Sequence, residues 1–141
     1  MSIVQTQTTS FKAELYQGIH DLTTDVIKIA LYTANANLNA DTTVYSSTNE
    51  VAATGTYSLG GAQLTPITVS SSTSDATAYV GFPNISWTGA ITARCALIYN
   101  SSKANRAIAV LDFGSDKTMS PTFTITMPSN TSTTALIRSS Y

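Results

Sequence analysis

Apolar residues recur with a helical period only near the start of the chain. Four of them are spaced at i, i+4, i+8 and i+11, which places them on one face of a helix. They are Phe11, Leu15, Ile19 and Leu22. Ser10, or Thr9 before it, is suited to cap this helix, because hydroxyl side chains accept the free backbone N–H groups of a first turn. The spacing therefore predicts a helix over residues 11–22, preceded by an N-terminal arm, residues 1–10.

From residue 26 onward the pattern changes to the two-residue alternation of β-strands. Ile27, Ile29 and Leu31, for example, fall on one face of a strand, and Lys28 falls on the other. Segments of this kind, separated by turn-forming residues, are 26–32, 62–70, 76–82, 85–87, 91–99, 106–113, 121–127 and 134–138. They predict an all-β fold, which is a β-sandwich or jelly roll of about eight antiparallel strands with one N-terminal helix. We expect a single domain, residues 11–141.

The segments 91–99 and 106–113 are the strongest candidates for direct pairing. Each has an alternating apolar set, and only a short polar stretch connects them. The sets are Cys95, Leu97 and Tyr99 in the first segment, and Ile108 and Val110 in the second. This arrangement predicts an antiparallel hairpin.

A long polar stretch, residues 33–61, separates the first predicted strand from the second. Tyr45, Val51, Tyr57 and Leu59 lie within it, so we expect it to pack on the domain and not to behave as a disordered linker. Connections of this length usually have a function or a partner.

The composition excludes several classes of function. Charged residues make up 11% of the chain and hydrophobic residues 43%, while serine and threonine supply about three residues in ten. The net charge is −1 and the lysines and arginines are scattered, so the chain lacks the basic patch of a nucleic-acid-binding protein. No apolar run approaches the length that spans a bilayer, and the first ten residues lack the features of a signal peptide. We therefore expect no nucleic-acid or membrane partner, and synthesis in a cytoplasm.

Histidine and cysteine, the most versatile catalytic side chains, each occur once. The position of His20 after the predicted helix favours a surface or helix-terminal role over that of a general base. With no second histidine and no Gly-x-Ser-x-Gly elbow, the sequence shows neither a zinc site nor a serine triad. Cys95 alternates with Leu97 on an apolar strand face, which predicts a buried and unreactive thiol.

The carboxylates offer only weak alternatives. They are Glu14, Asp21, Asp25, Asp41, Glu50, Asp75, Asp112 and Asp116. A glycosidase needs two of them about 5–10 Å apart in a cleft, and Asp112 and Asp116 are close in sequence. Residues 112–117 also carry oxygen ligands for calcium, but they lack the ligand rhythm and closing glutamate of an EF-hand.

Aromatic residues could form a platform for a carbohydrate. Tyr32, Tyr79, Trp87 and Tyr99 are the candidates, although such residues more often belong to the core of a sandwich. From the residues alone we assign no catalytic residue, no cofactor-binding residue and no metal ligand. We expect that the protein is not an enzyme and needs no cofactor.

Two stretches, residues 25–33 and 91–117, carry a family resemblance. Together with residues 48–51 and 123–128, they make nearly the whole chain similar to a family of small structural proteins of tailed-phage virions. Residues 91–117 are the most specific part. The resemblance implies a capsid decoration or cement protein that binds the outside of the capsid and joins neighbouring major capsid subunits on the virion surface.

A protein in that role, placed at three-fold lattice sites, is expected to be a homotrimer, because its symmetry then matches the lattice. We also expect residues 1–10 and 33–61 to contact capsid or neighbouring subunits. A tail, baseplate or receptor-binding component of the virion is the alternative, and a carbohydrate-binding module is a more distant one. The number of copies per particle separates decoration from a tail component.

Overall fold

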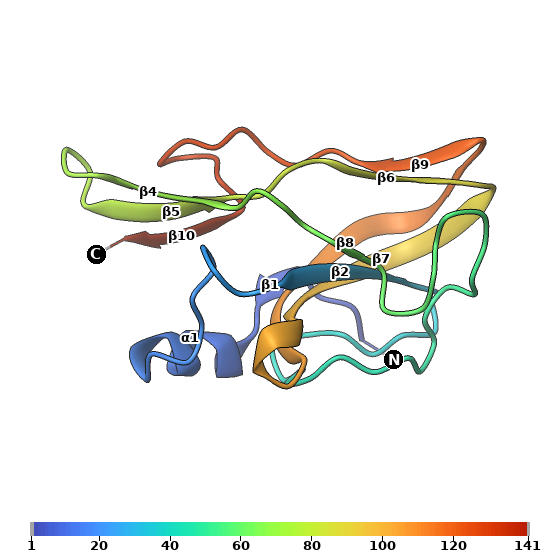
Figure 1. The fold of residues 1–141 in the computed structure, drawn as a ribbon, viewed down its shortest axis with the longest axis horizontal. Coiled ribbons are helices and arrows are strands. Elements are labelled where there is room, and N and C mark those ends of the chain that lie inside the picture. Colours follow the sequence, from blue (N-terminus) through green and yellow to red (C-terminus); the bar gives the residue numbers. More distant parts are fainter. Residues whose placement is uncertain (1, 141) are drawn as a thin grey trace.

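The computed structural model describes residues 2–140, which form antiparallel strands and one α-helix at the periphery of the molecule (Figure 1). In chain order the elements are β1 Thr6–Gln7, α1 Thr9–Tyr16, β2 Ile27–Tyr32, β3 Ala62–Gln63, β4 Thr68–Ser72, β5 Thr77–Gly81, β6 Ile85–Thr88, β7 Ile91–Asn100, the 3-10 turn η1 Ser101–Lys103, β8 Arg106–Met119, β9 Thr122–Ile125 and β10 Ile137–Ser140. The predicted all-β fold with one N-terminal helix is confirmed. Met1 and Tyr141, the outer ends of the predicted arm and domain, lie outside the described residues.

The centre of the molecule is a five-stranded sheet in the order β1-β8-β7-β2-β3. Its β7–β8 pair is the predicted hairpin, closed by η1. A bulge in β8, residues 113–116, lies opposite the single residue Arg94 of β7. Gly114 adopts a φ of +85° there, a left-handed conformation that favours glycine.

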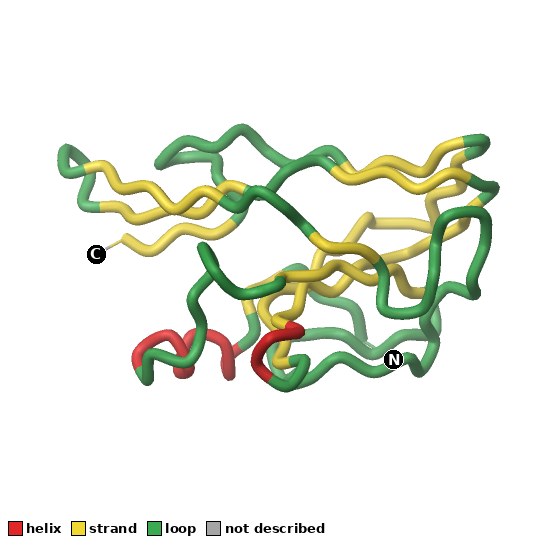
Figure 2. The backbone as a smooth tube through the Cα atoms, in the orientation of Figure 1, coloured by secondary structure: helices red, strands yellow, loops and turns green. Residues whose placement is uncertain are grey.

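A second layer covers one face of this sheet (Figure 2). It consists of a three-stranded sheet, β10-β5-β4, and a two-stranded sheet, β6-β9. The chain runs from β6 directly into β7 and from β8 directly into β9, so the β6–β9 pair continues the β7–β8 pair after a fold. At this fold the backbone N–H of Gly89 donates to the carbonyl oxygen of Pro121 at 2.6 Å. The two facing β-layers agree with the expected sandwich arrangement.

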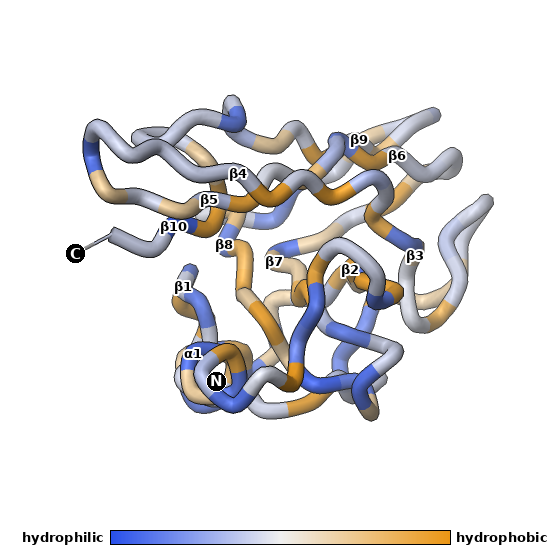
Figure 3. Tube along the Cα trace, turned by 60° about the vertical axis from the view of Figure 1, so that its left-hand side comes forward, coloured by the Kyte–Doolittle hydropathy of each residue, from blue (hydrophilic) through white to orange (hydrophobic). Residues whose placement is uncertain are grey.

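Both faces of the central sheet are buried. Ile29 and Leu31 of β2 pack into the core between the layers, whereas Ala30 and Tyr32 pack into a second core on the opposite face. The first part of residues 33–61 and the N-terminal residues cover this second core with irregular chain, whereas Val51 and Tyr57 of the same stretch pack into the core between the layers. The expectation that this stretch packs on the domain is confirmed. Figure 3 shows apolar residues concentrated along strands such as β8, and strongly hydrophilic residues in the connecting loops.

The helix is shorter than predicted and begins earlier. It spans Thr9–Tyr16, and its N-cap is Thr8, whose hydroxyl accepts the backbone N–H of Phe11 at 3.2 Å. The predicted caps, Thr9 and Ser10, are instead the first helical residues. Gly18, with a φ of +72°, ends the helix in the left-handed conformation that a C-terminal glycine commonly adopts.

The prediction of residues 11–22 was wrong at its C-terminal half because the apolar period continues past this glycine. Of the predicted face, Phe11 and Leu22 are buried. Leu15, by contrast, keeps 42% of its surface exposed.

Residues 2–10 are built into the domain and do not extend from it as an arm. Thr6 and Gln7 pair with Val110 and Ala109 of β8. Ile3 forms a parallel bridge with Leu38. The predicted arm therefore supplies an edge strand of the central sheet and part of the cover of the second core.

Candidate functional site

The single histidine lies in a polar network at the tip of the β7–β8 hairpin. The side chain of His20 is fully buried, its Nε2 lies 2.8 Å from Glu14 Oε1, and its Nδ1 lies 3.0 Å from Asn100 Nδ2. An amide nitrogen only donates, so Nδ1 accepts this bond and the proton of the neutral ring is on Nε2. The expected surface position of His20 was wrong, because Asn100, eighty residues away in the sequence, covers it.

The same network holds two carboxylates that are paired with cations. Asp25 accepts from Asn100 Nδ2 at 2.8 Å and from Lys103 Nζ at 2.9 Å, and Glu14 accepts from Arg106 at 2.8 Å. Burial alone would raise the pKa of Asp25, but the bonds from Asn100, the Asp21 backbone and Lys103 lower it to about 2. Through these hydrogen bonds and ion pairs, the network connects α1 and the residues just before β2 to the tip of the hairpin.

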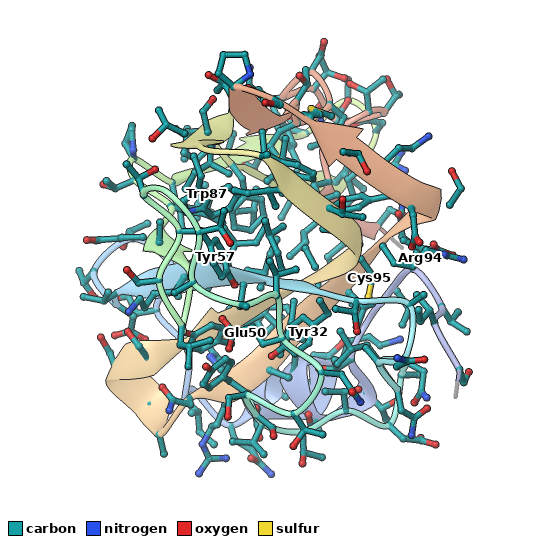
Figure 4. All side chains as sticks on the ribbon, turned by 90° about the vertical axis from the view of Figure 1, so that its right-hand side faces the viewer. Tyr32, Glu50, Tyr57, Trp87, Arg94 and Cys95 are labelled. Carbon is teal, nitrogen blue, oxygen red and sulfur yellow. The ribbon has the colours of Figure 1, made fainter. Side chains whose placement is uncertain are left out.

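A second buried polar group holds residues 33–61 against the central sheet (Figure 4). The carboxylate of Glu50 accepts the hydroxyls of Tyr45 at 2.5 Å and of Tyr57 at 2.6 Å, and the backbone N–H of Gly60 at 2.8 Å. Tyr57 also accepts the backbone N–H of Leu31 in β2 at 2.8 Å. Figure 4 shows Tyr57 between Glu50 and Trp87, whose ring it meets edge-on at a centroid distance of 5.3 Å.

The tyrosines of this group are poor acids. Burial, followed by the nearby Glu50 carboxylate, raises the pKa of Tyr57 and of Tyr45 above the usual range, and raises the pKa of Tyr99 to about 12. Tyr99 donates its hydroxyl to the carbonyl oxygen of Gly60 at 2.5 Å. These hydroxyls therefore stay protonated and serve as hydrogen-bond donors that fasten the segment.

Cys95 lies where its strand pattern predicted. It is fully buried in the second core, and burial raises the pKa of its thiol to about 12. A thiol with this pKa carries almost no thiolate near neutral pH, and the thiolate is the nucleophilic form. The prediction of a buried cysteine is confirmed.

The pair Asp112 and Asp116 does not form a carboxylate site. Asp112 accepts the backbone N–H of Gly114, which is the main reason for its lowered pKa, and forms an ion pair with Arg94. Asp116 lies exposed in the bulge of β8. Across residues 2–140 no cluster of three or more His, Cys, Asp or Glu side chains has the arrangement to hold a metal ion.

Most of the aromatic residues considered as a carbohydrate platform belong to the cores. Tyr32, Trp87 and Tyr99 are at most 3% exposed, and Tyr79 is half-buried in β5. Trp87 Nε1 is the one buried side-chain polar atom without a hydrogen-bond partner among the described residues. The preference for a core role is confirmed for the three buried residues.

One concave surface is an open groove along one side of the two layers. Its volume is about 650 Å³, and a smaller pocket of about 350 Å³ adjoins it at Leu136, which lines both. One wall comes from β8 and the N-terminal residue Gln5, and the other from residues 123–128. The apolar part of the lining consists of Leu111, Phe113, Met119, Phe123, Ile125, Met127, Pro128 and Leu136.

The groove exposes the edge of β9. Residues 123–128 line it consecutively, although neighbouring side chains in a strand point to opposite faces. A consecutive lining means that the backbone edge itself faces the groove. Among the described strands, β6 is the only neighbour of β9, so the groove-facing edge is unpaired.

Sequence patterns did not predict this groove. Its walls come mainly from β8 and from residues 123–128, which follow β8 closely in the chain, and they face each other because β9 folds back over β8. The one available signal was the alternation of Phe123, Ile125 and Met127 with threonines, which marks a strand but not a free edge.

Comparisons with known proteins give no relative of this chain. No family model, no curated protein and no solved structure matches it. In the part of the chain that the structure describes, no helix has the length and apolar character needed to cross a membrane.

Proposed function

We propose that this protein is a structural component of a tailed-phage virion that binds the outside of the capsid and cements neighbouring major capsid subunits. The observation that carries the proposal is a division of roles within the chain. The residues best suited to chemistry, among them His20, Glu50 and Cys95, are buried and engaged in holding the fold. The features open to solvent include exposed apolar side chains and an unpaired strand edge. The similarity of residues 91–117 to virion structural proteins supports the same role.

Exposed apolar side chains on the two predicted contact segments support this function. Val4 keeps 49% of its surface exposed, Val44 49% and Leu59 59%, and all three lie in residues 2–10 or 33–61. We propose that these side chains lie against capsid or neighbouring subunits. A cement protein that binds only the assembled shell stabilises that shell by mass action. A homotrimer at three-fold sites would present three copies of this surface at once.

A cryo-electron reconstruction of the intact particle tests the proposal. We expect density for this chain over the junctions of capsomers, in copies that follow the lattice, and as trimers at three-fold positions. Particles made without this protein are the control, since the same density must be missing from them. Density confined to the tail would overturn the capsid role and favour the tail or baseplate alternative.

The contact segments are best tested by single substitutions. Deleting residues 2–9 would remove β1 and the helix cap at Thr8, so the loss of binding would not separate contact from unfolding. Leu59→Ser and Val44→Ser change exposed positions and leave the core intact. We expect each to weaken binding to capsids about tenfold or less, whereas Val69→Ser, at an exposed apolar position in β4, leaves it unchanged. Unchanged binding of both test variants would exclude residues 33–61 from the contact.

A further inference from the structure

The groove between β8 and β9 combines an apolar floor with cations at separate places. Lys117 lines the larger part and Arg138 lines the smaller part. Neither cation forms an ion pair with a carboxylate in residues 2–140. None of the described residues that line the two parts is acidic. The groove is therefore complementary to a ligand that is apolar in the middle and negatively charged on either side.

The wall formed by β9 adds a requirement on the shape of the ligand. Its free edge offers backbone N–H and C=O groups that an extended chain satisfies by pairing as an additional strand. Natural proteins usually block such edges with charged residues, proline or bulges. Residues 122–127 contain neither a charged residue nor proline, and Pro121 and Pro128 stand only at their ends. The edge is thus open over the length of one short strand.

The apolar side chains of the floor are accessible to such a strand. Phe113, Met119 and Leu136 are half-buried and pack against the core between the layers. Phe113 and Phe123 approach each other with ring centroids 6.2 Å apart, at the bottom of the groove. Alternate side chains of an added strand would cover these groups and complete the open side of the core.

We propose that this groove binds an extended segment of a partner protein, in which apolar side chains stand between carboxylates. The segment pairs with the free edge of β9, its apolar side chains cover Phe113 and Leu136, and its carboxylates meet Lys117 and Arg138. This interaction goes beyond the proposed virion role, because it assigns a specific surface and a specific ligand chemistry, whichever particle component supplies the segment.

Peptide binding to the isotopically labelled protein, followed by NMR, tests this proposal. The probe is an eight-residue peptide with glutamate at both ends and alternating isoleucine and threonine between them. The comparison peptide has lysine at both ends. We expect the glutamate peptide to shift the backbone signals of residues 122–127 and to bind about tenfold more tightly than the lysine peptide.

Charge reversal in the protein sharpens the test. The double variant Lys117→Glu/Arg138→Glu should bind the glutamate peptide about tenfold more weakly and should now prefer the lysine peptide. Lys12→Glu changes an exposed lysine of α1, outside the groove, and should leave both affinities unchanged. Unchanged signals of the core residues in the double variant show that its fold is intact.

Backbone methylation of the peptide tests strand pairing separately. Two further glutamate peptides carry N-methyl groups on odd or on even residues, which blocks one edge of the strand or the other. Because an added strand pairs through one edge, we expect one of these peptides to bind like the parent and the other to lose binding. Equal binding of both would contradict pairing with β9.

Two further sets of results would contradict the binding of a partner segment in this groove. Failure of the glutamate peptide to bind at millimolar concentration, or binding that the double variant does not weaken, overturns the proposal. Signals of β9 that shift on dilution without peptide would assign the groove to a second copy of this chain and overturn the partner segment. The peptide titration needs only the purified protein, so a negative result would not bear on the capsid role tested by the particle reconstruction. In the same way, a reconstruction that places the protein at the tail would not contradict peptide binding in the groove.

Discussion

The two faces of the central sheet are buried by different means, although β7 contributes neighbouring residues to both. Ile98 faces the second layer, where strands β4, β5, β6, β9 and β10 close the core. Leu97, the preceding residue, faces the second core, which residues 33–61 cover with irregular chain. Figure 1 shows the ordered layer on one side of the sheet and the loops with the N-terminus on the other.

The second layer and the irregular segment, which we call the two covers of the central sheet, differ in how their backbone N–H and C=O groups find hydrogen-bond partners. Strands pair their N–H and C=O groups with neighbouring strands, whereas a buried irregular segment must find other partners for them. Here Glu50 accepts the N–H of Gly60, Tyr99 donates to the carbonyl of Gly60, and Tyr57 accepts the N–H of Leu31. The irregular cover therefore relies on buried polar side chains to satisfy backbone groups, whereas the strands of the second layer pair with one another.

The largest expected effect on stability comes from truncating Ile98 and Leu97, neighbouring residues of β7 whose side chains face opposite sides of the central sheet. We expect Ile98→Ala to lower the free energy of unfolding by about 4 kcal/mol, because the cavity lies between two strand layers that cannot close over it. Leu97→Ala should cost about 2.5 kcal/mol, because the irregular cover can relax into the cavity. Urea denaturation measures both. Equal costs, or a larger cost for Leu97→Ala, would contradict the difference between the covers.

The next prediction tests the hydrogen bonds to Glu50 that hold the irregular cover on the central sheet. Glu50→Ala removes the acceptor of three hydrogen bonds, so we expect a loss of about 3 kcal/mol, at about 1 kcal/mol for each. Hydrogen exchange should accelerate in residues 45–61 and stay unchanged in β4 and β10, which belong to the three-stranded sheet. Glu50→Gln keeps one acceptor oxygen and should lose less. Uniform acceleration over the whole chain would show that the carboxylate supports global stability and not this cover alone.

Sequence patterns predicted the elements whose signals are local. The β7–β8 hairpin and the packing of residues 33–61 follow from alternation and from buried residues such as Val51 and Tyr57. The helix end was missed because Gly18 takes a left-handed conformation inside a continuing apolar period. The environment of His20 depends on a contact with Asn100, eighty residues away, and the open groove depends on how β9 folds back over β8; neither carries a periodic signal in a single sequence.

The hairpin tip, where α1 and residues 33–61 both contact the hairpin, should determine part of the acid sensitivity. Arg106 binds Glu14 of α1, and the carbonyl of Asn105 accepts the N–H of Tyr45. In the folded protein the pKa of Asp25 is lowered from 3.8 to about 2, so its carboxylate stabilises the fold above about pH 4 and loses this contribution as the pH falls to about 2.

Asp25→Asn should therefore remove about 1–2 kcal/mol of stability near neutral pH, and this difference from the original protein should shrink toward zero near pH 2. Urea unfolding across that range measures it, and the difference between the two proteins cancels the contributions of the other carboxylates. A constant difference at every pH would show that the loss comes from packing and not from the charge of Asp25.

The smallest effect concerns Thr8, which joins the helix to β8 of the central sheet. Thr8 caps α1 through the N–H of Phe11, and its own backbone N–H donates to Ile108 of β8 at 2.9 Å. The N–H of Thr9 donates to Ala40 of the irregular cover at 2.9 Å. Thr8→Ala should cost about 1 kcal/mol, because it removes the side-chain cap and keeps these backbone bonds. Thr9→Ala, at one of the two positions that the sequence pattern offered as a cap, should change the stability by less than about 0.5 kcal/mol. Equal losses for the two variants would contradict the assignment of the cap to Thr8.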